Sequence, residues 1–263
     1  MASEFSGAAH PLDDEGLHAA LALIKVGLPE LWAVVSVETS GCGYLPSKRP
    51  QILFERHVFS RETGGRYDAA HPDISNPVAG GYGAGGEAQY ARLQQALALD
   101  RAAALHSTSW GIGQIMGYNA VVAGFAGAEE MVQSFCESEN SQLLAMARFL
   151  VRNTLDRPLQ KRDWKSFARG YNGPSYQKNS YDTRLAANYA KFRAGALPDL
   201  TVRAAQLYLV YLGRHPGAVD GIIGRLTLSA LNDFQRDSGL QPSEGICAAE
   251  VEALRKAVEA SSL

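Results

Sequence analysis

Glu38 is the side chain whose position along the chain most suggests chemistry. It ends an apolar, helix-like run that begins at Leu28 and continues through Val37, and small residues with two glycines follow it. No other acidic or basic side chain lies between Glu30 and Lys48. A carboxyl group at the edge of an apolar wall has its pKa raised, and a neutral carboxylic acid can protonate a glycosidic oxygen. The alternative is a glutamate at a helix end that faces water.

A second candidate element is the stretch Ser-Thr-Ser-Trp-Gly-Ile-Gly-Gln-Ile-Met-Gly-Tyr-Asn, residues 107–119. Its glycines bring the backbone close either to another element or to a ligand. Its polar side chains offer hydrogen bonds and its tryptophan offers a stacking face, a combination that suits a sugar. We therefore take Ser109, Gln114 and Asn119 as candidates for sugar binding. A tight junction between a helix and a loop is the alternative.

A third candidate element is Phe-Ala-Arg-Gly-Tyr-Asn-Gly-Pro, residues 167–174. The Gly-Pro pair stops a helix and leaves Tyr171 and Asn172 exposed, where both side chains could bind substrate. An ordinary helix C-cap, with the asparagine in a left-handed turn, is the alternative.

These residues must be positioned by a fold that is mainly α-helical. Asp13 and Asp14 can cap a first helix that ends at Gly27, and Pro29 opens the next one. Residues 51–60 are predicted to be extended, and the glycine-rich and proline-rich residues 63–86 form a long loop of the kind that is usually functional. Further helices are expected at 89–105, 114–123, within 129–153 as a pair, and at 164–171, 183–192, 201–212, 225–238 and 248–260.

Three short motifs occur in the order seen in lysozyme-superfamily enzymes. They are Glu-Thr-Ser-Gly at 38–41, Gly-Ile-Gly-Gln-Ile-Met at 111–116 and Gly-Tyr-Asn-Gly-Pro at 170–174. Soluble lytic transglycosylases and goose-type lysozymes carry similar elements.

The closer resemblance is to the N-acetylmuramidase family of modular phage endolysins, and it extends over residues 31–192. It includes Ile-Leu-Phe-Glu-Arg-His-Val-Phe at 52–59, His-Pro-Asp-Ile-Ser at 71–75 and Ser-Glu-Asn-Ser-Gln-Leu at 138–143. The resemblance implies an α-rich, lysozyme-like catalytic domain with its acid at a helix end, beside a small extended lobe.

The C-terminal residues resemble a different family, the three-helix peptidoglycan-binding domain. The motif that carries this resemblance is Asp-Gly-Ile-Ile-Gly-Arg-Leu-Thr at 220–227, followed by Phe-Gln at 234–235. The pattern departs from the family at His215, where a Tyr-like aromatic often stands. Gly195 and Pro198 break the helical pattern before it. We therefore predict a catalytic domain at 1–195 and a binding domain at 196–263.

The resemblance implies that Glu38 is the general acid of a peptidoglycan hydrolase, protonating the oxygen that leaves C1 of N-acetylmuramic acid. A second carboxylate is needed about 6.5–9.5 Å away in an inverting hydrolase and about 5–5.5 Å away in a retaining one. Glu55 is the first candidate, and a buried partner of a nearby arginine is its alternative. Asp68 and Asp73 are further candidates. Solvated or capping charges are expected at Glu62, Glu87 and Glu139.

Other functions stay open at this point. A lytic transglycosylase would use Glu38 alone and release 1,6-anhydro products, and the Gly-x-x-Gln-Ile-Met element does not exclude it. A non-catalytic wall-binding or virion protein would be expected to lack the acid. Chitinase activity is a weaker alternative, distinguished by turnover of a polymer without muramic acid.

Composition and charge limit the partners. The formal net charge of -2 gives no general attraction to nucleic acid or anionic membranes. No apolar run approaches about 18 residues, so no membrane span is expected. Widely spaced cysteines and the lack of ligand clusters predict no disulfide framework, metal or cofactor. The N-terminus shows no Sec signal. We expect a monomer made in the host bacterial cytoplasm that acts on wall peptidoglycan after release.

Overall fold

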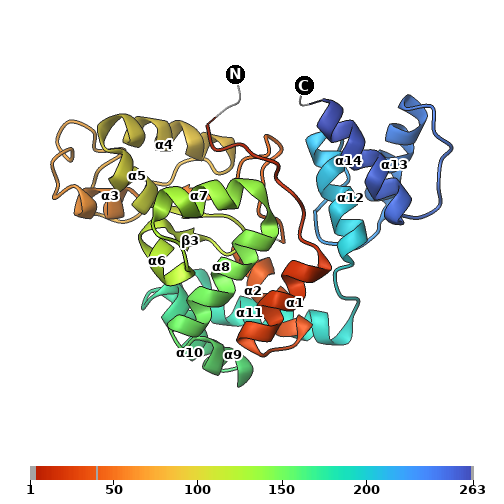
Figure 1. Cartoon of the computed structure of the whole chain (residues 1–263). Helices are drawn as coiled ribbons and strands as arrows, with labels where there is room; N and C mark the ends of the chain where they lie inside the picture. The colour runs from red at the N-terminus through yellow and green to blue at the C-terminus, as the bar shows by residue number, and fades with distance from the viewer. Residues whose placement is uncertain (1–3, 40, 262–263) are drawn as a thin grey trace. The chain divides into compact units, whose positions relative to one another are not determined.

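The computed structural model describes residues 4–39 and 41–261. Within them the chain is mainly α-helical with one small three-stranded sheet (Figure 1). This confirms the predicted fold class. The chain forms two compact units. One comprises Met1–His10 with Gly43–Asp156, and the other comprises Pro11–Cys42 with Arg157–Leu263. Ser40, in the Glu-Thr-Ser-Gly motif, and residues 1–3, at the N-terminus where no Sec signal was expected, lie outside the described residues.

The unit that contains residues 43–156 is built around the sheet. Its order is β1-β2-β3, antiparallel throughout, with Ile52 opposite Trp110 and Trp110 opposite Ile115. Its strands are β1 (Ile52–Phe54), β2 (Thr108–Trp110) and β3 (Ile115–Met116). Its helices are α3 (Arg56–Glu62), α4 (Glu87–Leu99), α5 (Arg101–His106), the 3-10 turn η1 (Gly117–Asn119), α6 (Ala120–Ala123), α7 (Ala128–Glu137) and α8 (Glu139–Arg152).

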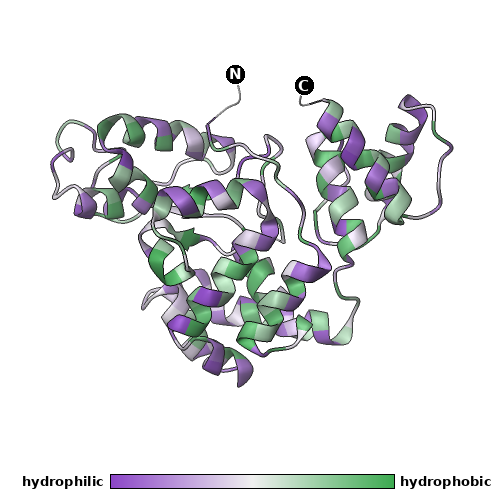
Figure 2. Cartoon of the chain, viewed as in Figure 1, coloured by the Kyte–Doolittle hydropathy of each residue, from purple (hydrophilic) through white to green (hydrophobic). Residues whose placement is uncertain are grey.

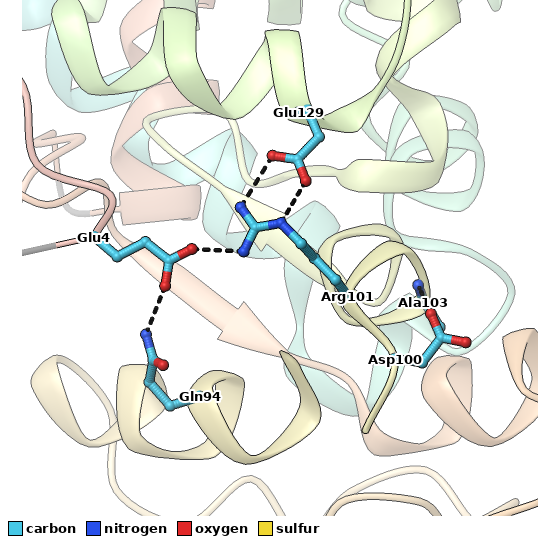
Figure 3. A network of polar contacts seen from close by, with 6 residues as sticks. All are labelled: Glu4, Gln94, Asp100, Arg101, Ala103 and Glu129. Carbon is cyan, nitrogen blue, oxygen red and sulfur yellow. Dashed lines mark hydrogen bonds and ion pairs between the residues drawn. The ribbon is translucent and has the colours of Figure 1, made fainter. Parts of the chain in front are cut away.

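Arg101 ties the N-terminal segment to this unit. Its guanidinium donates to both carboxylate oxygens of Glu129 at 2.6 and 3.1 Å and to Glu4 at 2.6 Å (Figure 3). Gln94 donates to the other oxygen of Glu4 at 3.2 Å. Because these groups are largely exposed, each pair contributes about 0–1 kcal/mol, and the network orders the segment more than it stabilises the unit.

The other unit is formed by helices from both ends of the chain. Its central helix is α2 (Leu28–Thr39), which buries residues around most of its circumference, including Trp32 and Val34. A helix that is apolar on nearly every side is a core helix. In Figure 1, α2 and α11 lie side by side although they are far apart in sequence. The other helices are α1 (Asp14–Ile24), α9 (Asp156–Gln160), α10 (Trp164–Asn172), the 3-10 turn η2 (Tyr176–Asn179) and α11 (Tyr181–Ala194).

Three C-terminal helices complete this unit, namely α12 (Leu200–Tyr211), α13 (Arg225–Asp237) and α14 (Ala248–Ala260). They share a core that includes Leu209, Leu231 and Leu254. Figure 2 shows green hydrophobic and purple hydrophilic residues on each helix, as expected where one face is buried. The Gln206 carboxamide holds the turn before α13 by accepting from the Gly221 amide at 2.8 Å. The domain boundary at 195/196 stays a prediction.

The structure corrects three predicted elements. Residues 51–60 are extended only to Phe54, because α3 begins at Arg56. The helix predicted at 89–105 is two helices, because the Asp100 side chain accepts from the Ala103 amide and caps a new one. The helix predicted at 114–123 begins only at Ala120, since the preceding residues pair with β2 and then form η1.

No single helix among residues 4–39 and 41–261 combines the length and apolar composition of a membrane span. Helices α1 and α2 meet those criteria only as a pair, bent by 105° at the break between them.

Candidate active site

Glu38 is half-buried near the C-terminal end of α2. Its neighbours Val37 and Thr39 are buried. Glu38 therefore stands at the end of a buried helix and not at a solvated one. The backbone carbonyl of Val37 accepts a hydrogen bond from Nη2 of Arg184 at 3.0 Å. Arg184 belongs to α11, which therefore binds the helix end that carries Glu38.

Two tyrosines surround the Glu38 carboxyl group. The Tyr181 hydroxyl, at the start of α11, donates to Oε1 of Glu38, and Tyr181 is only 2% exposed. The ring of Tyr171 stacks between Phe167 and Tyr181, with ring centroids 5.4 and 6.4 Å apart. Glu38 and Tyr171, both predicted from sequence, are thus brought together. Asn172 is exposed at the end of α10, where Gly173 has a φ of 80° and ends the helix.

Burial raises the pKa of Glu38 to about 7. The hydrogen bond from Tyr181 and the charge of Arg184 offset part of the rise. Burial, followed by the negative charge of Glu38, raises the pKa of Tyr171 and of Tyr181, so both hydroxyls keep their protons. A carboxyl group with a pKa near 7 is protonated in a large fraction of molecules at neutral pH, as a general acid requires.

Glu55 lies in the other unit, at the junction between β1 and α3. Its backbone amide donates to the Ser107 carbonyl at 2.8 Å, and its Oε2 lies 3.1 Å from Nδ1 of His57. Burial raises the pKa of Glu55, while His57 and Tyr82 offset part of the rise. Glu55 and His57 do not continue the predicted extended segment, because the chain turns helical at Arg56.

Ser109 and Gln114 hydrogen-bond to each other. The Ser109 hydroxyl donates to Oε1 of Gln114 at 2.8 Å. Nε2 of Gln114 donates to the carbonyls of Gly111 at 2.9 Å and Gln51 at 3.3 Å. The two side chains therefore stabilise the turn between β2 and β3. Asn119 ends the 3-10 turn η1 in the same unit and is half-buried.

The glycines of the 111–116 motif approach α8. A Cβ on Gly111 would lie 2.7 Å from the Gln142 side chain, and one on Gly113 would lie 2.8 Å from Met146. Oε1 of Gln142 accepts from the Ile112 amide at 2.7 Å. The structure therefore supports the interpretation that these glycines allow close approach to another element.

The prediction that Glu139 is a solvated or capping charge is wrong. Glu139 is fully buried at the start of α8, and its Oε1 accepts from the Gly43 amide at 2.8 Å. Asp68, a further candidate for the second carboxylate, accepts from the hydroxyls of Ser60 at 3.0 Å and Ser75 at 2.5 Å. It thereby orders the long loop.

Among the described residues, no three or more His, Cys, Asp or Glu side chains form a group that could hold a metal ion.

Sequence reasoning missed Tyr181 and Arg184. Each lies more than one hundred residues from Glu38, and only the packing of α11 on α2 brings them to the carboxyl group. A tyrosine and an arginine three residues apart on a polar helix carry no signal of such a role.

The comparisons with known proteins assign the chain to a family. The N-acetylmuramidase family model matches residues 27–193, and the model of a peptidoglycan binding domain matches residues 199–250. The chain belongs to the N-acetylmuramidase family, and together the two matches make it a peptidoglycan hydrolase.

Among solved structures, the chain is similar to the crystal structure of a Burkholderia AP3 phage endolysin. The identity is 36% and the TM-score 0.63, over 70% of this chain and 72% of that one. The likeness supports the predicted lysozyme-like, α-rich fold. No curated protein matches the chain.

Proposed function

We propose that this hydrolase cleaves the β-1,4 bond between N-acetylmuramic acid and N-acetylglucosamine, with Glu38 as the general acid. The observation that carries the proposal is the state of the Glu38 carboxyl group. Burial raises its pKa to about 7, and the Tyr181 hydroxyl donates to Oε1, which leaves Oε2 to hold the proton. Transfer of that proton to the glycosidic oxygen makes the sugar a better leaving group.

For Glu55 we propose the role of the carboxylate that activates water. A general base works best when its pKa lies near the working pH, and burial moves the pKa of Glu55 in that direction. His57 and Tyr82 next to it offset part of this rise, so the carboxylate form stays accessible.

The proposed sugar contacts fall into two groups. Asn119, Tyr171 and Asn172 offer amide or hydroxyl groups to sugar hydroxyls. Ser109 and Gln114 already bond to each other, so their proposed contribution is to fix the turn that meets the substrate.

The proposed site of action is the bacterial cell wall, where the chain acts as an endolysin. The peptidoglycan-binding match at 199–250 supports this, because a second attachment to one polymer raises the local concentration of the catalytic site. The AP3 phage endolysin, to which the chain is similar, supports the same role.

Substitution Glu38→Gln tests the proposal. The amide cannot donate the proton, so the rate of cleavage of purified peptidoglycan should fall by about 10²–10⁴-fold while wall binding persists. Glu30→Gln is the matched control, because it removes a carboxylate from the same helix, one that pairs with Arg162 at 2.8 Å. A Glu38→Gln protein with more than about a tenth of the wild-type rate would show that Glu38 is not the acid.

A further inference from the structure

Arg203 is a fully buried arginine in α12, within the region matched by the peptidoglycan-binding model. Its Nε and Nη2 both donate to the backbone carbonyl of Gly41, at 2.9 and 2.5 Å. Its guanidinium also lies 6.0 Å from the centre of the Trp32 ring in α2. A buried cation is costly unless its hydrogen bonds are made, so this fork fixes the Gly41 carbonyl firmly.

Gly41 is three residues beyond Glu38 and follows the end of α2. Its φ is 98°, and an added Cβ would lie 3.2 Å from the carbonyl oxygen of Val219. The backbone after the catalytic helix thus passes close to the C-terminal segment in a conformation that favours glycine. A cation at this place also suits the negative end of the α2 dipole.

A pocket of about 250 Å³ adjoins the contact between Arg203 and Gly41, lined by Trp32 and Gly41 and, from the C-terminal segment, by Asp220 and Ile222. The hydrogen bonds from Arg203 are thus a direct link between the C-terminal segment and Gly41. Arg184 binds the carbonyl of Val37 on the other side of Glu38, so two arginines hold the backbone on both sides of that residue.

We infer that Arg203 is a positioning residue for Glu38, and that the C-terminal helices complete the catalytic apparatus instead of serving only as a tether. The inference rests on the proposed role of Glu38. Arg203 acts through the Gly41 carbonyl on the end of α2, and so keeps the carboxyl group in its enclosed position beside Tyr171, Tyr181 and Arg184.

The test compares three full-length variants with the wild type on a soluble glycan oligomer that contains muramic acid. Arg203→Gln removes both the charge and the fork, whereas Arg203→Lys keeps the charge and loses the fork. Arg214→Gln is the control, because Arg214 is also C-terminal but pairs with Asp237 at the surface. We expect kcat to fall roughly tenfold for Arg203→Gln and less for Arg203→Lys, with KM little changed and sacculus binding retained.

A second readout is the titration of Glu38 followed by carbon-13 NMR. A loosened loop admits water, so the pKa of Glu38 should fall toward its ordinary value in both Arg203 variants, and the alkaline limb of the kcat profile should move to lower pH. Arg203→Lys serves if Arg203→Gln does not fold. Unchanged kcat and unchanged Glu38 titration in a folded variant would overturn the inference. If Glu38→Gln stays active, the proposed function fails. The titration of Glu38 in the Arg203 variants still shows whether Arg203 positions Glu38, so the two failures can be told apart.

Discussion

The raised pKa of Glu38 makes stability depend on pH in a direction that can be worked out. The ordinary pKa is 4.5 and the folded value is about 7, so between them the folded chain holds a proton that the unfolded chain has lost. Stability therefore falls as pH rises through this window, and is lowest above it. The raised pKa that the proposed role of Glu38 requires therefore weakens the fold at neutral and alkaline pH.

We predict that Glu38→Gln raises the free energy of unfolding above pH 7. The gain over wild type should be about 1–3 kcal/mol, from 1.36 kcal/mol per pKa unit reduced for partial solvent exposure. It should shrink toward zero below pH 4.5, where both states of the wild type are protonated. Urea unfolding at pH 5 and pH 8 measures it. A variant that is less stable than wild type at both pH values would contradict the burial argument.

Tyr181→Phe should change the pH dependence of the reaction. The tyrosine hydroxyl stabilises the ionised form of Glu38, so its removal should raise the pKa of Glu38 by roughly one unit. The alkaline limb of the pH–rate profile should move to higher pH by the same amount. Tyr189→Phe is the control, since Tyr189 lies on the same helix and packs against Trp164. If the alkaline limb of the Tyr181→Phe profile does not move, the Tyr181 hydroxyl does not influence the titration of Glu38.

At the residue scale, the sequence could predict the raised pKa of Glu38 because its signal is local. The apolar run, its single final carboxylate, and the small residues and glycines after it all lie between Leu28 and Gly43. Tyr181 and Arg184 were not predictable in this way, because their role depends on which faces of α2 and α11 meet. That choice is made by tertiary packing, which leaves no spacing rule in the sequence.

At the scale of elements, Glu55 shows where a local pattern misleads. The apolar and aromatic residues after Gln51 are typical of a strand, yet α3 begins at Arg56 and Glu55 stands at the junction. Aromatic residues on both sides of that junction serve the core, with Phe54 and Phe59 both fully buried and their ring centroids 5.8 Å apart. Periodicity over ten residues cannot separate a strand followed by a short helix from one longer strand.

Glu55→Gln should abolish hydrolysis and leave the unfolding temperature nearly unchanged, if Glu55 activates water as proposed. Replacing a carboxylate whose burial is unfavourable by a neutral amide costs the fold little. Activity assays paired with thermal unfolding test this. Glu62→Gln is the control, because Glu62 ends α3, the helix that follows Glu55, and contacts Arg61 and His106 near the surface. A drop of several degrees in Glu55→Gln alone would identify a structural carboxylate.

The glycine-rich motif between β2 and η1 is a second lesson at this scale. The glycines in the sequence indicate a close approach of the backbone. From the sequence alone, Gly111 and Gly113 could face either another element or a ligand. The structure places Gln142 and Met146 of α8 against them. The motif and the Ser-Glu-Asn-Ser-Gln-Leu segment thus pack on each other through Gln142.

At the scale of the whole molecule, the sequence predicted the mainly α fold and the three C-terminal helices, because helical patterns dominate the chain. It did not predict how the chain divides into compact units. Residues 11–42 group with 157–263, which includes α12–α14, so the polypeptide crosses between units more than once. Such grouping follows from long-range contacts like that of Arg203 with Gly41. The change in composition at Gly195 and Pro198 gives no information about which distant residues make those contacts.

The most direct test of the central claim is mass spectrometry of the soluble fragments released from purified peptidoglycan. Wild-type protein should release glycan fragments that end in reducing N-acetylmuramic acid, and Glu38→Gln should release almost none. Fragments ending in 1,6-anhydro-N-acetylmuramic acid, lighter by one water, would identify a lytic transglycosylase instead. Reducing N-acetylglucosamine ends, or intact glycan with cleaved peptides, would contradict the muramidase assignment.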